Sequence, residues 1–219
     1  QNIQTNQTTA EKYALTIKSN LEHLIHSNIQ TISGLISVIR VSPNIKQDLL
    51  SRYIKDLLAQ NSQLLNIIIS ANLQELNEGI IKPDKTKTIK INPDKNTIKQ
   101  LFIEGPINSD TGNEIFIIKI PVYIDDTKQL FWGNVSLIID AFEFYQHNNL
   151  LKSEKYDIAL KGKDSLGANG AFFLGDPLIY TLSPILKTIE LPNGSWQLAI
   201  YPKLGWNNIS YKYVKLSNI

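Results

Sequence analysis

The histidines are the first candidates for chemistry, because histidine binds metals and transfers protons near neutral pH. His23 and His26 lie three residues apart, so in a helix they share a face and could hold a metal ion. The carboxylate of Glu22 points to another side of such a helix. Because no third ligand stands at a suitable spacing, the pattern favours solvated helix residues, and we expect no metal site.

The carboxylates and glycines suit turns and helix ends better than a catalytic centre. Asp125-Asp126 fits a tight turn, and Asp140 stands where a strand passes into a helix, the position of an N-cap. The run from Gly167 to Gly170 lacks the following helix that a phosphate-binding loop requires. The sequence shows no nucleophile beside a base and has no cysteine, so we expect neither catalytic residues nor a cofactor.

Charge and composition weigh against several classes of partner. Lys and Arg number 22 against 20 Asp and Glu, a net charge of +2, which gives no general attraction to nucleic acid. Residues 71–99 are lysine-rich without interleaved aromatics for base stacking. We interpret them as a solvated loop, with a duplicated turn as the alternative. No run of about 20 apolar residues is long enough for a bilayer span, and both ends of the chain resemble those of a piece cut from a longer protein.

Two amphipathic helices are expected at the start of the chain. In residues 9–41 apolar positions recur at steps of three and four, the period of one helix face: Ile17, Leu21, Leu24, Ile25, Ile29, Ile32, Leu35, Ile36 and Ile39. Ser42-Pro43-Asn44 ends this helix. A second helix is expected at about 46–60, with a buried side formed by Leu49, Leu50, Tyr53, Ile54, Leu57 and Leu58.

The rest of the chain has the pattern of strands and turns in two sets. The first set comprises residues 64–69, 101–104, 115–123 and 130–140, of which the last two form an antiparallel hairpin, with a short helix at 141–149. The second set comprises residues 156–160, 171–174, 185–189 and 195–201, joined by turns rich in Gly and Pro. Two antiparallel sheets after a long helix predict an α+β fold with the helix packed along both.

Alternation in the first set of strands offers the parts of a small-molecule pocket, which needs apolar walls and a few polar groups. One face of residues 115–123 could form the walls with Phe116, Ile118 and Ile120. Polar groups could come from Glu104, Asn134 and Ser136. Lys119, on the other face of its strand, is the rival specificity group if the ligand is anionic and that face is occupied. An ordinary sheet core is the alternative for each residue.

Several segments, taken in order, carry a family resemblance that covers nearly the whole chain. They are Val41-Ser42-Pro43-Asn44, Leu65 to Ile69, Glu104-Gly105-Pro106, Ile118 to Tyr123, Phe131 to Asp140, Ala159 to Gly162, Phe172 to Pro177, Leu191 to Trp196, and Gly205-Trp206. Together they resemble the CHASE family of extracellular sensor domains, which occur in plant cytokinin receptors, bacterial diguanylate cyclases and histidine kinases. Residues 71–99 depart from the longer segment usual in that family, so the ligand class does not carry over.

The resemblance implies a long N-terminal helix alongside two tandem PAS-like modules with antiparallel sheets. We expect the stalk helix and second helix in residues 1–61, the membrane-distal, ligand-binding module in 62–150 and the membrane-proximal module in 151–219. Trp196 and Trp206 are expected to fill the core of the second module. Adding Pro106 from the resembling segment, the expected ligand-binding residues are Glu104, Pro106, Phe116, Ile118, Ile120, Asn134 and Ser136.

The resemblance also implies a place in a signalling receptor. Such a domain lies on the periplasmic or extracytoplasmic face of the plasma membrane between transmembrane helices. A cytoplasmic diguanylate cyclase, phosphodiesterase or histidine kinase would read its signal. We expect a small-molecule ligand of unknown identity, no nucleic acid partner, and weak homodimerisation through the long helix. The alternative is a ligand-free protein-interaction or structural module of a periplasmic receptor.

Overall fold

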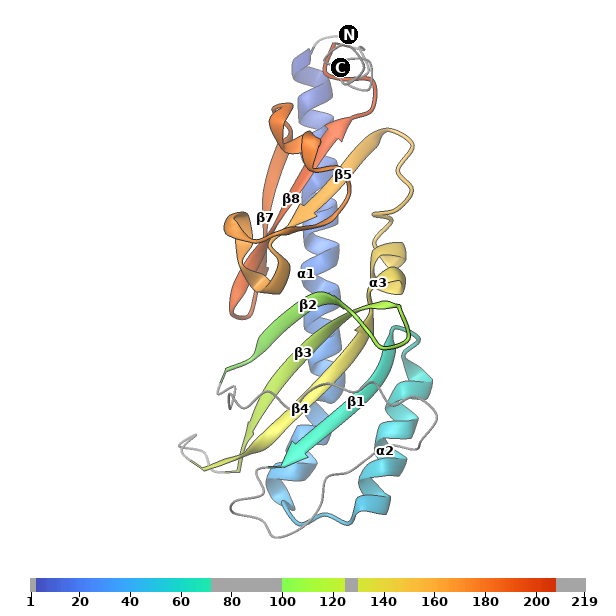
Figure 1. The fold of residues 1–219 in the computed structure, drawn as a ribbon, viewed down its shortest axis with the longest axis vertical. Coiled ribbons are helices and arrows are strands. Elements are labelled where there is room, and N and C mark those ends of the chain that lie inside the picture. Colours follow the sequence, from blue (N-terminus) through green and yellow to red (C-terminus); the bar gives the residue numbers. More distant parts are fainter. Residues whose placement is uncertain (1–2, 72–99, 125–129, 208–219) are drawn as a thin grey trace. The chain divides into compact units, whose positions relative to one another are not determined.

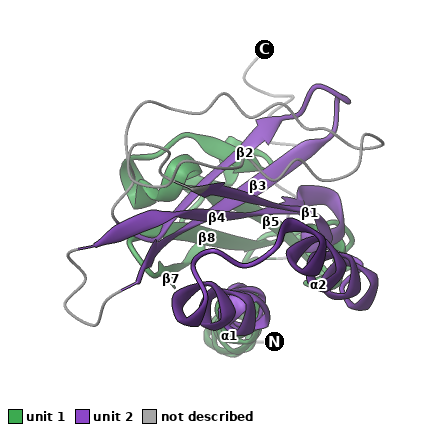
Figure 2. Cartoon of the chain, turned by 90° about the horizontal axis from the view of Figure 1, so that it is seen from below, with its two compact units in different colours: residues 1–24, 145–219 green, residues 25–144 purple. Residues whose placement is uncertain are grey.

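The structure is a computed structural model that describes residues 3–71, 100–124 and 130–207. They fall into two units, coloured separately in Figure 2: unit 1 comprises residues 1–24 and 145–219, and unit 2 comprises residues 25–144. Each unit contains one four-stranded sheet in which every pair of neighbouring strands is antiparallel. The expected α+β fold, a long N-terminal helix with two antiparallel sheets, is confirmed.

Helix α1 (Ile3–Val41), drawn in blue in Figure 1, contributes residues to both units. Its buried positions recur at steps of three and four: Ala10, Ala14, Ile17, Leu21, Ile25, Asn28, Ile32, Leu35 and Ile39. The helix begins six residues before the expected start at residue 9. These first residues are largely polar and carry no apolar period, so sequence periodicity could not detect them. Its end at Val41 agrees with the expected break at Ser42-Pro43.

Unit 2 packs two helices on one side of a sheet. Helix α2 (Gln47–Gln60) and α1 lie on the same side of the strands β1 (Leu64–Ala71), β2 (Phe102–Asn108), β3 (Glu114–Tyr123) and β4 (Phe131–Asp140), as Figure 2 shows. The strand order is β1-β4-β3-β2. In α2, Leu50 and Ile54 are buried, whereas Leu49 and Tyr53, expected on the buried side, are 46% and 39% exposed. The six expected positions span a wider arc than one helix can press against a sheet.

Unit 1 contains the second sheet, with strand order β6-β5-β8-β7. The strands are β5 (Tyr156–Lys161), β6 (Phe172–Leu174), β7 (Ile185–Leu191) and β8 (Gly194–Pro202). Short 3-10 helices η1 (Lys163–Ser165) and η2 (Gly167–Asn169) connect β5 to β6, and η3 (Pro177–Thr181) follows β6. Helix α3 (Ala141–His147) spans the boundary between the units in the sequence.

The core of unit 1 is tightly filled. Trp196 is 1% exposed, and Trp206 packs against the cluster of Ala159, Ile179, Ala199 and Tyr201. The expectation that tryptophan fills the core is confirmed for Trp196, whereas Trp206 is half-buried at the margin of the cluster. Among the residues that the structure describes, every helix is too short or too polar to cross a lipid bilayer.

Candidate site on the polar face of the sheet in unit 2

The register of the sheet in unit 2 separates its side chains into two sets. Ile118 stands opposite Leu137, which stands opposite Ile67, and residues on one rung point to one face of a sheet. We call this side the helix face; it carries buried apolar side chains on all four strands: Ile67, Ile69, Ile103, Phe116, Ile118, Ile120, Val122, Val135, Leu137 and Ile139. Phe116 also contacts the ring of Phe144 edge-on at 5.3 Å.

The opposite side, which we call the polar face, carries Glu104, Lys119, Asn134 and Ser136 among apolar neighbours. Lys119 stands opposite Ser136, and Asn134 stands two residues earlier on β4. The buried residues Ile115, Ile117 and Ile138 lie on the same face and pack with Leu65, Ile68 and Ile107. Because this cluster contains only strand residues and their immediate neighbours, we place the two helices against the other face.

An ion pair is the main feature of the polar face. Nζ of Lys119 on β3 lies 2.6 Å from Oε2 of Glu104 on β2, and the two side chains are 13% and 31% exposed. Glu104 shares its rung with two fully buried isoleucines, Ile117 and Ile138, and Lys119 stands on the next rung of the same face. A polar ligand could bind to both charges at this point, since apolar surroundings strengthen electrostatic interactions.

A bulge in β2 fixes the position of Glu104. The pairing with β3 is regular up to Glu104 opposite Ile117 and resumes at Ile107 opposite Ile115. Gly105 between them has a φ of 106°, and a Cβ there would lie 2.8 Å from the carbonyl oxygen of Ile115. Glycine is therefore required at this point. Pro106 follows it and is buried in the bulge.

Two polar atoms of β4 are buried without a partner in the part of the chain that the structure describes. Oδ1 of Asn134 is buried and has no hydrogen-bond partner among the described residues, and the same holds for Nε1 of Trp132. A buried polar group without a partner costs about 1–3 kcal/mol. Asn134 shares its rung with Pro121 and Ser70, next to the rung of Lys119 and Ser136. A ligand that donates a hydrogen bond to Asn134 would remove that cost.

The structure does not bring the expected ligand-binding residues together on one face. Phe116, Ile118 and Ile120 lie on the helix face in the core, whereas Glu104, Asn134 and Ser136 lie on the polar face. The physical reason is a bulge in β4 at Trp132: Tyr123 stands opposite Phe131 but Val122 opposite Gly133. The extra residue shifts the register by one and reverses the faces.

Lys119, Ile117 and Ile138 therefore replace the apolar set as neighbours of Glu104, Asn134 and Ser136. The sequence named Lys119 only as a rival group, and it did not point to Trp132. Alternation along β3 is enough to show that Ile117 and Lys119 share a face. The bulge at Trp132-Gly133 places Ile117 and Lys119 on the same face as Ser136. Alternation along a single strand does not reveal such a bulge.

The remaining candidates for chemistry lie elsewhere. His23 and His26 are exposed on α1, and the described residues contain no group of three or more side chains arranged to hold a metal ion. Asp140 is confirmed as an N-cap, since its Oδ1 accepts a hydrogen bond from the backbone N–H of Glu143 at 3.1 Å. The expected loop at 71–99 and the turn at 125–128 lie outside the described residues, apart from Ala71 at the end of β1.

Comparison with known proteins shows the fold. No protein family model matches the chain, and no curated protein matches it by sequence. Among solved structures, the extracellular domain of the putative histidine kinase rpHK1S-Z16 is 14% identical, with 90% of this chain and 93% of that chain covered and a TM-score of 0.62. At so low an identity the similarity shows the fold and not the ligand.

Two similar structures are ligand-binding domains of bacterial chemoreceptors. That of the Pseudomonas aeruginosa PAO1 amino acid chemoreceptor PctB, in complex with L-Arg, is 12% identical with a TM-score of 0.65, covering 90% of this chain and 94% of that one. That of Campylobacter jejuni Tlp3, in complex with 4-methylisoleucine, is 11% identical with a TM-score of 0.62, covering 92% of each chain. The chain thus has the PAS-like fold of these sensory domains, with a long N-terminal helix and two four-stranded antiparallel sheets.

Proposed function

We propose that this chain is the ligand-sensing domain of a transmembrane receptor on the extracytoplasmic side of the membrane, and that it is not an enzyme. The fold supports this reading, because the similar structures are extracellular or ligand-binding domains of a histidine kinase and of chemoreceptors. The family segments support it independently of the fold, since they carry the resemblance to CHASE sensor domains along nearly the whole chain.

The ligand site is proposed on the polar face of unit 2. The observation that carries this proposal is the ion pair of Lys119 and Glu104, 2.6 Å long, with a lysine side chain that is only 13% exposed. On the same face, Oδ1 of Asn134 is buried without a hydrogen-bond partner among the described residues. Buried polar atoms without partners are uncommon in folded proteins and call for a specific reason. A ligand site provides one, because the polar atoms then find their partners in the complex.

A small zwitterion, such as an amino acid, fits this arrangement. Its carboxylate would pair with the ammonium of Lys119 and its ammonium with the carboxylate of Glu104. The ion pair within the protein would thus be replaced by two ion pairs with the ligand. Asn134 would accept a further hydrogen bond. The similar chemoreceptor domains were solved with L-Arg and with 4-methylisoleucine, ligands of this class. Of the seven expected residues, Glu104, Asn134 and Ser136 keep a direct role in this proposal, and Pro106 shapes the bulge that positions Glu104.

The wider setting belongs to the same proposal. Transmembrane helices would flank the domain, a cytoplasmic kinase or cyclic-dinucleotide enzyme would read its state, and two copies would associate weakly. Membership of the CHASE family itself rests on the resembling segments. The second candidate is a ligand-free interaction module. It is favoured by the Lys119–Glu104 pair already being satisfied without a ligand.

A binding screen separates the two. Thermal shift with the twenty L-amino acids, γ-aminobutyrate and matched uncharged amides, followed by calorimetry, should show stabilisation by one zwitterionic group of compounds. Lys119→Met should reduce that shift strongly at the same ligand concentration, whereas Arg52→Met, which removes an exposed charge on α2, should leave it intact. A flat response of the wild-type chain to every compound, or an unchanged response of Lys119→Met, would overturn the proposed site.

A further inference from the structure

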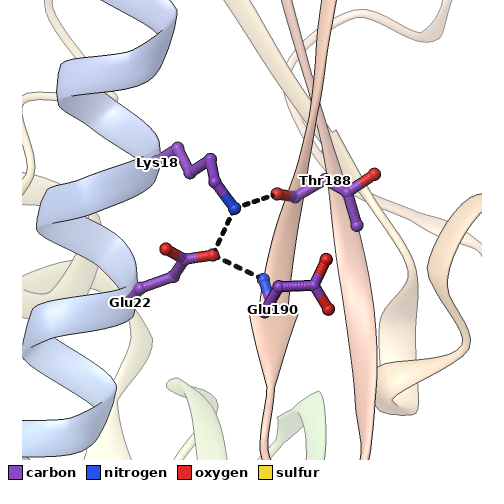
Figure 3. Close-up of polar contacts among 4 residues, drawn as sticks. All are labelled: Lys18, Glu22, Thr188 and Glu190. Carbon is purple, nitrogen blue, oxygen red and sulfur yellow. Dashed lines mark hydrogen bonds and ion pairs between the residues drawn. The ribbon is translucent and has the colours of Figure 1, made fainter.

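The outer edge of β7 in unit 1 has partners that are not a strand. In the order β6-β5-β8-β7, this strand has a neighbour on one side only among the strands that the structure describes. Figure 3 shows two side chains of α1 reaching its backbone on the other side. Nζ of Lys18 donates to the carbonyl oxygen of Thr188 at 2.6 Å, and Oε1 of Glu22 accepts from the N–H of Glu190 at 2.7 Å.

These two side chains take the place of a neighbouring strand. An edge strand leaves alternate C=O and N–H groups unpaired, and here an ammonium supplies the missing donor and a carboxylate the missing acceptor. The two side chains also bind each other, with Nζ of Lys18 2.5 Å from Oε1 of Glu22. The resulting chain of contacts runs from Thr188 through Lys18 and Glu22 to Glu190 without a gap (Figure 3).

Helix and strand geometry make the fit specific for one position. Residues four apart rise about 6 Å along a helix, and residues two apart rise about 6.6–6.8 Å along a strand. Lys18 and Glu22 are four apart, and Thr188 and Glu190 are two apart, so the pair matches the repeat of the strand edge. A displacement of α1 by one residue, about 1.5 Å, would take both side chains off their partners.

The order of the two charges supports a role beyond helix stability. A lysine that precedes a glutamate by four residues is the weaker of the two orientations for an intrahelical pair. Its contacts with β7 are therefore the stronger reason for this pair to occur here. A further ion pair lies about two turns earlier in α1, where Oε1 of Glu11 is 2.8 Å from Nζ of Lys187 on the same strand.

We propose that Lys18 and Glu22 form a releasable clamp that fixes the position of α1 along the edge of β7. Apolar contacts between the helix and the sheet are non-directional and tolerate a small slide, whereas charge-assisted hydrogen bonds to two fixed backbone groups do not. The side chains are 26% and 24% exposed, so water can replace their contacts and the clamp can open. Helix α1 also supplies residues to unit 2, so the clamp constrains an element that both units share.

The clamp is a property of unit 1 and does not depend on ligand binding. Only its use in signalling, where a ligand-driven shift of α1 would have to break it, rests on the proposed function. An experiment on the chain without any ligand therefore tests the clamp by itself. Failure of the ligand screen would leave the result of that experiment unaffected, and the reverse is also true.

Amide hydrogen exchange measured by NMR provides the first test. The N–H of Glu190 depends on Glu22, whereas the N–H of Ile189 belongs to the next position of the same strand and serves as the internal reference. Glu22→Ala should raise the amide exchange rate of Glu190 relative to that of Ile189 by about tenfold. This is the change expected when the amide loses a charge-assisted hydrogen bond. Asp48→Ala, which breaks an exposed pair of the same i,i+4 spacing on α2, should leave the ratio unchanged.

A distance measurement provides the second test. The chain has no cysteine, so Ser19→Cys on α1 and Lys155→Cys before β5, both exposed, give two unique positions for spin labels. The clamped chain should give one narrow distance distribution. The double variant Lys18→Met with Glu22→Ala should broaden this distribution or add a second distance. The single variant Lys18→Arg keeps both a donor at residue 18 and the native Glu22, so it should give the narrow distribution of the clamped chain.

The proposal is overturned if the double variant keeps the native distance distribution and the native exchange ratio at Glu190. Circular dichroism shows whether the double variant is folded. If it is not, Lys18→Met alone decides the matter, because it removes the donor to Thr188 and keeps the apolar stem of the side chain. An unchanged distribution in a folded Lys18→Met chain would likewise overturn the clamp.

Discussion

The ammonium of Lys119 lies 2.6 Å from the carboxylate of Glu104, on the opposite side of the sheet from the buried ring of Phe116. The two sides of one strand thus have different tasks. Phe116, Ile118 and Ile120 belong to the core, where each lost methylene group destabilises the fold. Lys119 lies among polar groups whose removal is expected to change binding more than folding. This separation makes the two roles testable by mutation.

Lys119→Met should lower the affinity for a zwitterionic ligand by roughly 10- to 100-fold, as expected when a charged hydrogen bond is lost. Methionine keeps the length of the apolar stem, so the packing changes little. Glu104 is left without its partner but is 31% exposed, so water can solvate it and the unfolding free energy should fall by no more than about 1 kcal/mol. Calorimetry gives the affinity and urea unfolding gives the stability. Wild-type affinity in Lys119→Met would contradict the prediction.

Ser136→Trp should abolish binding while the fold survives. Ser136 is half-buried between Lys119 and Ile68 on neighbouring strands, and an indole at this point would fill the space over the polar face. A binding site tolerates added volume better than a packed core does. Binding by calorimetry and near-ultraviolet circular dichroism of the same sample check the two halves. Intact binding in Ser136→Trp would mean that this face is not the ligand site.

Ile118→Ala is the matched control on the helix face. Ile118 is 1% exposed, and truncation of such a residue costs about 2–5 kcal/mol of unfolding free energy. Below the temperature at which this variant unfolds, its intrinsic affinity should equal that of the wild type. A large loss of affinity in the folded variant would show that the ligand reaches the helix face after all.

The strands themselves were predictable, because alternation and turn residues mark them in the sequence. All eight expected strands occur, with ends that differ by a few residues. The pairing of β3 with β4 was harder to predict. Continuing the pairing of Tyr123 with Phe131 without a bulge would place Ile118 opposite Ser136 and Ile120 opposite Asn134, which is the combination that the sequence predicted as a pocket.

One inserted residue, Trp132, reverses this outcome. It shifts the pairing so that Ile118 stands opposite Leu137 and Lys119 opposite Ser136. Side chains alternate with a period of two along a strand, so a slip of one residue exchanges the faces completely. Sequence periodicity reports which residues of a strand share a face. It does not report which faces of two strands coincide, since that depends on bulges formed by long-range packing.

Enlarging Ala159 should cost stability and leave the intrinsic affinity unchanged. Ala159 is fully buried in unit 1. A Cβ placed on Gly175 would lie 2.9 Å from the Cβ of Ala159, so no space is left beside Ala159. Ala159→Leu should lower the unfolding free energy by about 1–3 kcal/mol through overpacking. Urea unfolding and calorimetry on the same preparation check both points. A change of affinity in the folded variant would place a ligand in unit 1.

Tyr180 should make the stability of the chain fall at high pH. Its hydroxyl donates to the carbonyl oxygen of Gln197 at 2.6 Å. Burial raises the pKa of this phenol above its ordinary value near 10, although a hydrogen bond with the backbone of Lys161 opposes the shift. The folded state therefore holds the phenolic proton more tightly than the unfolded state does. The stability that this group contributes is complete below about pH 10 and is lost as the pH rises through the folded pKa.

Tyr180→Phe isolates this effect from the other tyrosines. At pH 8 the variant should be less stable by about 1 kcal/mol, because Gln197 loses its donor. Between pH 8 and pH 11 the difference from the wild type should shrink, since phenylalanine cannot ionise in the unfolded state. Urea unfolding of both proteins at each pH measures the difference, and absorbance near 295 nm follows ionisation. A difference that stays constant or grows above pH 10 would mean that Tyr180 ionises as easily in the folded chain as in the unfolded one.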